Sequence, residues 1–396
     1  MDIDLLKAKI IAEIDNRQTE LVDLSRQIHD NPELGFQEKQ AAGWLAEYLG
    51  KNGFNVESGI CEFPTAFRAF YGRNSPAIAL LAEYDALPEI GHACGHNLIA
   101  VASVAAAVGA KAAADEGGGQ VIVIGTPAEE LYAGKQVMAR RGAFNDLDAA
   151  MMVHPGSHNS AATQALACQR LDIEFFGKAA HAAARPEAGI NALAAMILAF
   201  NAIDALRQHV GPKCRVHGVI TDGGSAANVV PAHSAGNFLV RAQDEKTLTD
   251  LKQKVLNCFI GAATATGAKL EYKWEPDYYA PMLNNLAIGR LYVNNMRRLG
   301  RVTSLGDNDT GFGSTDFGNV SQLVPGMHAN IAIGRNGTPI HTQQFAKAAV
   351  SEAGMEAMLL AAKGLALTVA DLLTSPSLMA KVKREFFKGQ RVKPQN

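Results

Sequence analysis

Several features that mark large classes of protein are scarce in this sequence. Aromatic residues make up 7% of the chain and charged residues 19%, and the formal net charge is only -2. A chain with so little excess charge lacks the basic footprint that binding to a phosphate backbone requires. We therefore expect no nucleic acid partner.

Cysteine is also scarce, and its spacing lacks the regularity of a disulfide framework. The five cysteines are odd in number and widely scattered: Cys61, Cys94, Cys168, Cys214 and Cys258. Small disulfide-stabilised secreted domains instead carry cysteines in even number at close spacing. The cysteine pattern therefore favours a reducing compartment.

Long uninterrupted apolar runs are missing as well. The most apolar stretches, 98–114 and 358–373, are rich in alanine and are interrupted by charged residues. We expect both to be packed core helices and expect no association with a membrane. The first residues, MDIDLLKAKIIAEID, are amphipathic and do not show a basic region followed by an apolar one. We therefore expect a cytoplasmic protein.

The sequence does have the length for two domains, with 396 residues of which 48% are hydrophobic. Apolar runs at 77–81, 121–125 and 149–154 alternate with helical patterns at 98–114 and 134–143. This alternation predicts an α/β sandwich domain with a mixed, mostly parallel sheet. A single helical pattern over 5–30 precedes it.

From about residue 168 the pattern changes to strands of alternating character around helices near 189–209 and 244–266. This pattern predicts a four-stranded α+β domain inserted into the first domain. We expect a catalytic domain made of 1–167 and 285–396, and an inserted domain made of 168–284.

Groups that bind metal ions gather at the carboxyl ends of the predicted strands or just before the last helix. These residues are Asp85, Cys94, His96, Glu129, Glu130, His154 and His341. Open α/β sheets bind ligands at this edge, and imidazole, thiolate and carboxylate suit zinc and its neighbours. Five ligands are too many for one tetrahedral ion with an open position. They suit two ions that share a bridging ligand.

The adjacent pair Glu129 and Glu130 needs two different roles. Neighbouring residues in an extended segment point to opposite sides, so we expect only one of them to bind metal. The other carboxylate can then act as a general base toward a metal-bound water. Pro127 stiffens the turn that holds the pair.

Each of these residues alone has an ordinary structural explanation. A single buried histidine is more often a hydrogen-bonded core residue, and Cys94 can be a small buried filler. A pair of glutamates often begins a solvated helix. The metal interpretation depends on the coincidence that these groups follow strands of the same sheet.

Five motifs carry a resemblance to a known family. They are AEYDALPEIGHACGHN (82–97), GTPAEE (125–130), MVHP (152–155), GKAAHAAARPEAGINAL (177–193) and PIHT (339–342). Together they closely resemble subfamily D of the M20 metallopeptidase and amidohydrolase family. The segments GHACGHN (91–97) and GSTDFGNVSQLVPGMHANIAIG (313–334) look most like its dipeptidase-like subgroup. The match runs in the same order over nearly the whole chain.

The resemblance implies a role for each residue of the cluster. Cys94 takes the place of the bridging ligand, His96 and His154 complete one metal site, and Glu130 and His341 complete the other. Glu129 corresponds to the general base, and Asp85 to the carboxylate that orients a histidine ligand. The implied cofactors are two divalent ions, zinc or manganese, with cobalt or nickel as alternatives.

The inserted domain then resembles the family's ferredoxin-like lid, which also forms a homodimer. His181 resembles the histidine that polarises the scissile carbonyl, often that of the neighbouring subunit. Asn228 and Arg241 match positions that hold the substrate carboxylate or shape the lid. Taken alone, His181 fits equally well as a polar residue at a helix start, and Arg241 as a locally paired strand residue.

The resemblance implies a binuclear hydrolase that cleaves a dipeptide or N-acyl amino acid next to a free carboxylate, with Glu129 activating a metal-bridging water. An aminobenzoyl-glutamate or N-acyl amino acid amidohydrolase is the alternative enzyme, and a non-catalytic metal-binding protein is the alternative outside enzymes. Three departures from the family pattern make the substrate less certain than the mechanism, and one of them is Asn97, where the wider branch has aspartate and the dipeptidase-like subgroup shares asparagine. Glu83 replaces the usual aspartate or histidine, and the bulky Leu131 and Tyr132 replace a glycine-rich turn.

Overall fold

The computed structural model describes residues 2–306, 313–334 and 338–391, except the side chains of Leu131, Tyr132 and Arg391. The chain divides into two compact units. Unit 1 comprises the described residues within Met1–Gln164, Met282–Gly311 and Asn319–Asn396. Unit 2 comprises those within Ala165–Pro281 and Phe312–Gly318. Segment 313–318 therefore differs from our prediction, which placed it with the catalytic domain.

Unit 1 is built on a six-stranded sheet in the order β1-β2-β4-β3-β5-β10. Its strands are β1 (Asn55–Ser58), β2 (Phe67–Arg73), β3 (Ala77–Ala82), β4 (Gly119–Gly125), β5 (Ala149–Gly156) and β10 (Gly326–Ala332). Strands β4, β3, β5 and β10 are mutually parallel, whereas β2 and β1 add antiparallel pairs at one side. Every residue of β3 is buried, as expected for a strand covered on both faces. The predicted mixed, mostly parallel sheet is confirmed.

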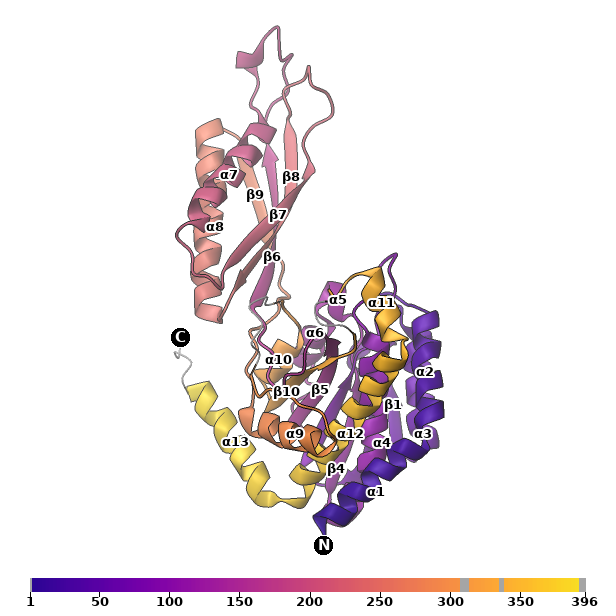
Figure 1. Ribbon diagram of the computed structural model, residues 1–396. Helices are drawn as coiled ribbons and strands as arrows, with labels where there is room; N and C mark the ends of the chain where they lie inside the picture. Colours follow the sequence, from indigo (N-terminus) through magenta and orange to yellow (C-terminus); the bar gives the residue numbers. More distant parts are fainter. Residues whose placement is uncertain (1, 307–312, 335–337, 392–396) are drawn as a thin grey trace. The chain divides into compact units, whose positions relative to one another are not determined.

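Two long apolar helices form the centre of unit 1. Helices α4 (His96–Gly117) and α12 (Glu352–Thr374) pack against each other and against the sheet (Figure 1). Both are long and apolar enough to cross a membrane, and both are largely buried inside the structure. Their alanine-rich surfaces allow the two helices and the sheet to approach closely. These are the packed core helices that the sequence predicted.

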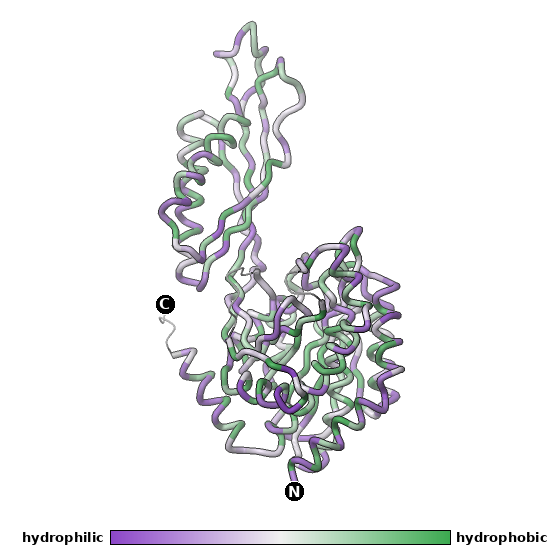
Figure 2. The backbone as a smooth tube through the Cα atoms, viewed as in Figure 1, coloured by the Kyte–Doolittle hydropathy of each residue, from purple (hydrophilic) through white to green (hydrophobic). Residues whose placement is uncertain are grey.

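Shorter helices surround this centre. They are α1 (Ile3–Asn16), α2 (Gln18–Asp30), α3 (Lys39–Lys51), α5 (Glu129–Tyr132), α6 (Gly134–Arg140), α9 (Leu286–Arg298), α10 (Phe317–Ser321), α11 (Gln343–Ala349) and α13 (Pro376–Arg391). The single helix predicted over 5–30 is wrong, because the chain leaves the helical conformation at Arg17. This break lets both α1 and α2 pack on α4. Figure 2 shows hydrophilic residues along these outer helices.

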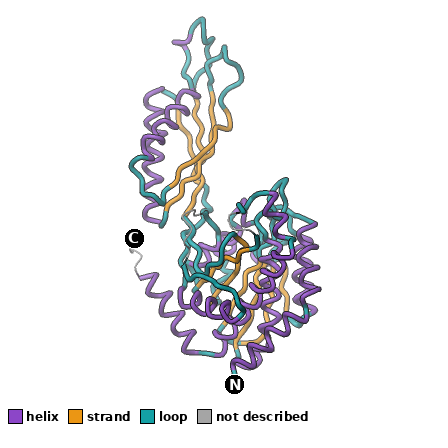
Figure 3. Tube along the Cα trace, viewed as in Figure 1, coloured by secondary structure: helices purple, strands orange, loops and turns teal. Residues whose placement is uncertain are grey.

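Unit 2 has one antiparallel four-stranded sheet in the order β7-β8-β6-β9. Its strands are β6 (Ala167–Phe176), β7 (Arg215–Asp222), β8 (His233–Ala242) and β9 (Lys269–Trp274). Helices α7 (Ala192–Arg207) and α8 (Glu245–Thr266) form a second layer against it (Figure 3). Burial alternates along β8, and its buried residues join the core beneath these helices. The βαββαβ order confirms the predicted ferredoxin-like unit.

Candidate metal centre

The loop between β3 and α4 places Cys94 and His96 beside His154. The residue between the first two, Gly95, has a φ of +78°, and a Cβ there would lie 2.5 Å from Pro155 Cγ. Only glycine allows the start of α4 to lie this close to the end of β5. Two segments about sixty residues apart in the chain thus bring their side chains together.

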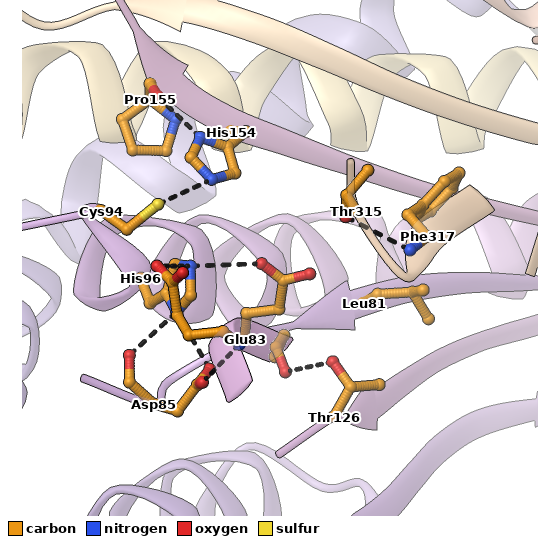
Figure 4. A network of polar contacts seen from close by, with 12 residues as sticks. Leu81, Glu83, Asp85, Cys94, His96, Thr126, His154, Pro155, Thr315 and Phe317 are labelled. Carbon is orange, nitrogen blue, oxygen red and sulfur yellow. Dashed lines mark hydrogen bonds and ion pairs between the residues drawn. The ribbon is translucent and has the colours of Figure 1, made fainter. Parts of the chain in front are cut away.

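The His96 ring has the orientation that a metal ligand requires. Its Nδ1 lies 3.0 Å from Asp85 Oδ1 and 2.8 Å from the Asp85 carbonyl oxygen. Both oxygens are acceptors, so Nδ1 carries a proton and, in the neutral ring, Nε2 presents its lone pair. That buried Nε2 has no hydrogen-bond partner among the described residues, but it lies within ion-pair distance of Glu83 Oε2 at 3.7 Å and of Glu130 Oε1 at 3.8 Å. Figure 4 shows the His96 ring beside Asp85, Glu83 and Cys94. Asp85 therefore orients His96, as expected for a carboxylate behind a ligand.

His154 is oriented in the same way by its own backbone. Its Nδ1 donates to the Pro155 carbonyl at 2.7 Å, which turns Nε2 toward Cys94 Sγ at 3.4 Å. The ring of His328, from β10, stacks on the His154 ring with centroids 5.7 Å apart. Burial raises the pKa of the Cys94 thiol well above its ordinary value. Such a thiol ionises only when a cation compensates its charge.

Glu129 and Glu130 begin the one-turn helix α5, directly after β4. The prediction that they point to opposite sides of an extended segment is wrong, because Ala128 adopts a left-handed conformation and starts a helix. The backbone N–H of Glu130 donates to Asp85 Oδ2 at 3.0 Å, and that of Ala128 donates to Glu38 Oε1 at 2.8 Å. A carboxyl oxygen of each glutamate lies within 4.8 Å of a His96 nitrogen.

His341 reaches the cluster through its backbone. Its N–H donates to the Ala93 carbonyl at 2.9 Å, and the residue takes a left-handed φ of +61°. The half-exposed ring then places Nε2 3.2 Å from Glu130 Oε1. A residue from the last part of the chain thus completes a cluster that begins at Cys94.

The candidate ligands form three overlapping groups, each with donor atoms within 4.8 Å of one another. The groups are Cys94, His96 and His154; Cys94, Glu130 and His341; and His96, Glu129 and Glu130. Cys94 belongs both to the group with the two histidines and to the group with His341, which is the position of a bridging ligand. The buried His96 Nε2, which accepts and donates no hydrogen bond among the described residues, and this mixture of sulfur, nitrogen and oxygen donors fit two divalent ions.

A buried ion pair that the sequence did not predict lies against the cluster. Glu83 and Lys135 are both almost fully buried, with Lys135 Nζ 2.5 Å from Glu83 Oε1. Burial opposes ionisation of Glu83, but the Lys135 ammonium, followed by His96, lowers its pKa below the ordinary value. Glu83 had been singled out only as a departure from the family. Lys135 gave no signal, since a lysine in a short helix is ordinarily exposed.

The predicted substrate residues all belong to unit 2. His181 is exposed, and its Nδ1 accepts hydrogen bonds from the N–H groups of Ala183 and Ala184 at 3.3 and 3.2 Å. Asn228 is close by, because its carbonyl accepts from Ala182 at 3.0 Å.

Arg241 lies near the opposite end of the unit 2 sheet and donates to Ser314 Oγ at 2.8 Å. Asn228 lies before the start of β8, and His233 is the first residue of that strand. Arg241 follows His233 by eight residues along β8, which corresponds to about 26 Å. One chain therefore does not bring Asn228 and Arg241 to the same carboxylate.

Comparison with known proteins places this arrangement among hydrolases. Residues 169–262 match the model of the peptidase dimerisation domain of M20 proteins. The chain is 39% identical to an Xaa-Arg dipeptidase of Mus musculus, over 97% of this chain and 93% of the relative. It is 31% identical to one of the subunits of the p-aminobenzoyl-glutamate hydrolase of Escherichia coli, over 92% and 91%.

Solved structures share the fold. A putative aminohydrolase from methicillin-resistant Staphylococcus aureus matches with a TM-score of 0.80 and 19% identity, over 93% of this chain and 100% of that one. A dinuclear metal binding peptidase of the M20 family from Bacillus subtilis matches with a TM-score of 0.71 and 23% identity, over 91% and 99%.

Proposed function

The chain belongs to the M20 family of hydrolases of amide and peptide bonds, and we propose that it is a two-metal dipeptidase cutting next to a free carboxylate. The observation that carries this proposal is the position of Cys94, which is shared by two groups of candidate ligands. Glu129 lies beside both His96 and Glu130, where a base for hydrolysis is needed.

In this proposal each residue of the cluster has one role. Cys94, His96 and His154 would hold one ion, and Cys94, Glu130 and His341 the other. Two divalent ions there would supply Lewis acidity toward a water and toward the scissile carbonyl. Glu129 accepts the proton of the attacking water and passes it to the leaving amine. Asp85 keeps the His96 proton on Nδ1 throughout.

Dipeptides with a basic C-terminal residue are the first substrates to test. Two curated relatives named Xaa-Arg dipeptidase, from mouse and human, are 39% and 37% identical over 97% of this chain. A second candidate, p-aminobenzoyl-glutamate, is favoured by the 31% identity to the bacterial hydrolase of that name. Both place a free carboxylate next to the amide bond, so they differ mainly in the acyl and side-chain groups.

A homodimer is part of the proposal. The matched dimerisation domain covers most of unit 2, which also carries His181 and Asn228. These two lie near the end of the unit 2 sheet opposite Arg241. In a dimer, one subunit can provide His181 and Asn228 and its partner can provide Arg241 for the same substrate.

The test is turnover of a substrate panel followed by mass spectrometry. Protein reloaded with zinc, manganese or cobalt is given basic dipeptides, N-acyl amino acids and p-aminobenzoyl-glutamate. Glu129→Gln should retain both ions and lose roughly 100- to 10,000-fold in kcat, the range expected for a general base. Glu47→Gln, on the exposed face of α3, is the matched control. Ion binding without turnover of any compound would favour a non-catalytic binding protein.

A further inference from the structure

His233 lies between two carboxylates on the face of the unit 2 sheet opposite its helices. Its Nδ1 is 2.6 Å from Asp222 Oδ2, and its Nε2 is 2.9 Å from Glu174 Oε2. Carboxylate oxygens only accept hydrogen bonds, and a neutral imidazole has a single N–H to donate. Only the protonated ring, which has an N–H on each nitrogen, satisfies both contacts.

One of these contacts closes the neck of the loop that carries Asn228. Loop 223–232 connects β7 to β8 and contains no charged residue. Asp222 is the last residue of β7 and His233 is the first residue of β8, so their pairing joins the two ends of the loop. The other oxygen of Asp222 accepts the N–H of Gly224 at 3.0 Å, which also holds the first turn of the loop.

The other contact reaches the strand that leads to His181. Glu174 belongs to β6, and the segment that carries His181 follows this strand directly. That segment pairs with the loop, because the N–H of Ala182 donates to the Asn228 carbonyl at 3.0 Å and His181 forms an isolated bridge with Val229. Through its two carboxylates the imidazole therefore connects the strands that lead to both predicted substrate residues.

The charges around the ring favour its protonated form. The hydrogen bond to Asp222, followed by that to Glu174, raises the pKa of His233 above its ordinary value. On the neighbouring strand β9, Glu271 lies opposite Glu174 but is paired with Lys269 at 2.6 Å. A histidine whose pKa is raised by its partners keeps both contacts below that pKa and loses one as the pH rises through it.

From these contacts we propose that His233 is a positioning residue for substrate binding, which as an imidazolium holds loop 223–232 and the segment with His181 together. The inference rests on the proposed function, because Asn228 and His181 take their roles from it. A neutral ring keeps one N–H, so deprotonation leaves one carboxylate facing a lone pair and frees one of the two strands' ends. Binding of the substrate therefore weakens as the pH rises.

The test compares metal-loaded parent protein with His233→Gln and His233→Arg. Glutamine is neutral at every pH, whereas arginine stays charged and can donate to both carboxylates. Hydrogen exchange of peptides covering 177–182 and 223–232 is followed by mass spectrometry at about pH 6 and about pH 9. At the lower pH we expect exchange about 3- to 10-fold faster in His233→Gln than in the parent, the size of two exposed ion pairs. At the higher pH the two should agree, and only His233→Arg should remain protected.

Two further readouts follow the same proton. The ratio of kcat/KM between parent and His233→Gln, for the dipeptide cut fastest in the panel, should fall from about 3- to 10-fold toward one over this range. An NMR titration of the His233 ring, assigned by its absence from the glutamine variant, should give a pKa above about 6.5. His209→Gln, at an exposed histidine after α7, is the matched control and should change none of these values.

The outcomes separate this inference from the function on which it rests. Equal exchange in parent and His233→Gln at the lower pH, or a His233 pKa at or below about 6.5, overturns the inference and leaves the proposed function standing. A parent that hydrolyses no compound of the panel overturns the proposed function, and the role in substrate binding with it. If His233→Gln does not fold, His233→Arg must exchange more slowly than the parent at about pH 9, and equal exchange there overturns the inference.

Discussion

Asp85 shows how one buried side chain can organise a site. Its Oδ1 accepts the His96 Nδ1–H at 3.0 Å, and its Oδ2 accepts the Glu130 backbone N–H at 3.0 Å. Both contacts lead to candidate metal ligands on different elements. The carboxylate therefore sets the direction of an imidazole and the position of a glutamate at once.

Asp85→Asn should disturb both ligands while leaving the fold intact. The amide has one acceptor oxygen in place of two, so either His96 or Glu130 loses its orienting bond. We expect metal affinity to fall roughly 10- to 100-fold, with little change in the circular dichroism spectrum. Chelator competition measures the effect. Unchanged affinity would show that His96 and Glu130 are held by other contacts.

Glu38 is a buried acid with an unusual proton affinity. Burial, aided by the nearby Asp85 charge, raises its pKa from 4.5 to about 7, despite the hydrogen bond from Ala128. An acid whose pKa is raised by folding favours the native state while it is protonated. Its destabilising effect is therefore absent below about pH 4.5, grows as the pH rises from 4.5 to about 7, and is complete above that.

Glu38→Gln should remove this dependence on pH. The glutamine oxygen can still accept from Ala128, so the backbone of the turn stays in place. We compare the free energy of unfolding of variant and parent in chelator-treated protein. As the pH rises from 4.5 to 7.5, we expect the difference to shift in favour of the variant by on the order of 2–3 kcal/mol. Urea unfolding at the two pH values measures the difference. A constant difference would mean that Glu38 does not titrate in this interval.

The sequence predicted the residues that gather in the cluster better than the residues that support them. Cys94, His96, Glu130, His154 and His341 could be selected because sulfur, imidazole and carboxylate groups followed successive strands. Glu38 and Lys135 could not, because a charged residue in a helical pattern is ordinarily solvated. Their burial arises from tertiary contacts, which no local pattern contains.

The segment from Pro127 to Gly134 is held by close backbone contacts. Ala128 and Ala133 have left-handed backbones, with φ values of 60° and 48°. Gly134 lies against the Pro127 carbonyl, and its N–H donates to the Ala128 carbonyl at 3.0 Å. The turn therefore closes on itself and holds α5 between two fixed points.

Gly134→Ala should open this turn. A Cβ 1.9 Å from the Pro127 oxygen forces the backbone to move, at a cost of about 1–3 kcal/mol, and Glu130 moves with it. We expect a lower melting temperature and weaker metal binding.

The matched control is Gly43→Ala in α3, where nothing lies within 4 Å of the new atom. It should be neutral or stabilising by up to about 1 kcal/mol. Equal effects at both positions would contradict the argument from close packing.

Elements with a strong periodic signal were predicted, and short or bent ones were not. The apolar runs of β3, β4 and β5 and the alanine-rich α4 were predicted from the alternation of apolar runs with helical patterns. Helix α5 was missed because a left-handed alanine starts it, and such a conformation is rare for a residue with a Cβ. The break at Arg17 was missed because apolar spacing continues across it.

The two edge strands of the unit 2 sheet differ in how well they are protected against pairing with another molecule. Edge strand β9 carries Lys269 and Lys273, each paired with a glutamate. Edge strand β7 instead exposes Val219 by 58%, and the adjoining α7 exposes Ile197 and Leu198. Lysines discourage strand pairing at an edge, so β7 is the edge that suits contact between two molecules.

Val219→Lys should therefore convert a dimer into monomers. A charge on β7 disfavours strand pairing without touching the core of unit 2. Light scattering after gel filtration should give the mass of a dimer for the parent and of a monomer for the variant. Turnover should fall as well, because His181 is expected to act on the neighbouring subunit. Tyr272→Lys on β9 is the control and should remain dimeric; a monomeric parent would refute the prediction.

The packing of α4 against α12 has a consequence for biosynthesis. The first helix begins at residue 96 and the second at residue 352, so the ribosome makes the two halves of one core far apart in time. Until the last part is released, the apolar surface of α4 lacks its cover and the cysteine and histidines lack His341. Contacts of such long range slow folding and expose chains to aggregation. In the sequence, the described residues of unit 2 all lie between α4 and α12. Unit 2 can therefore fold before α12 has been synthesised.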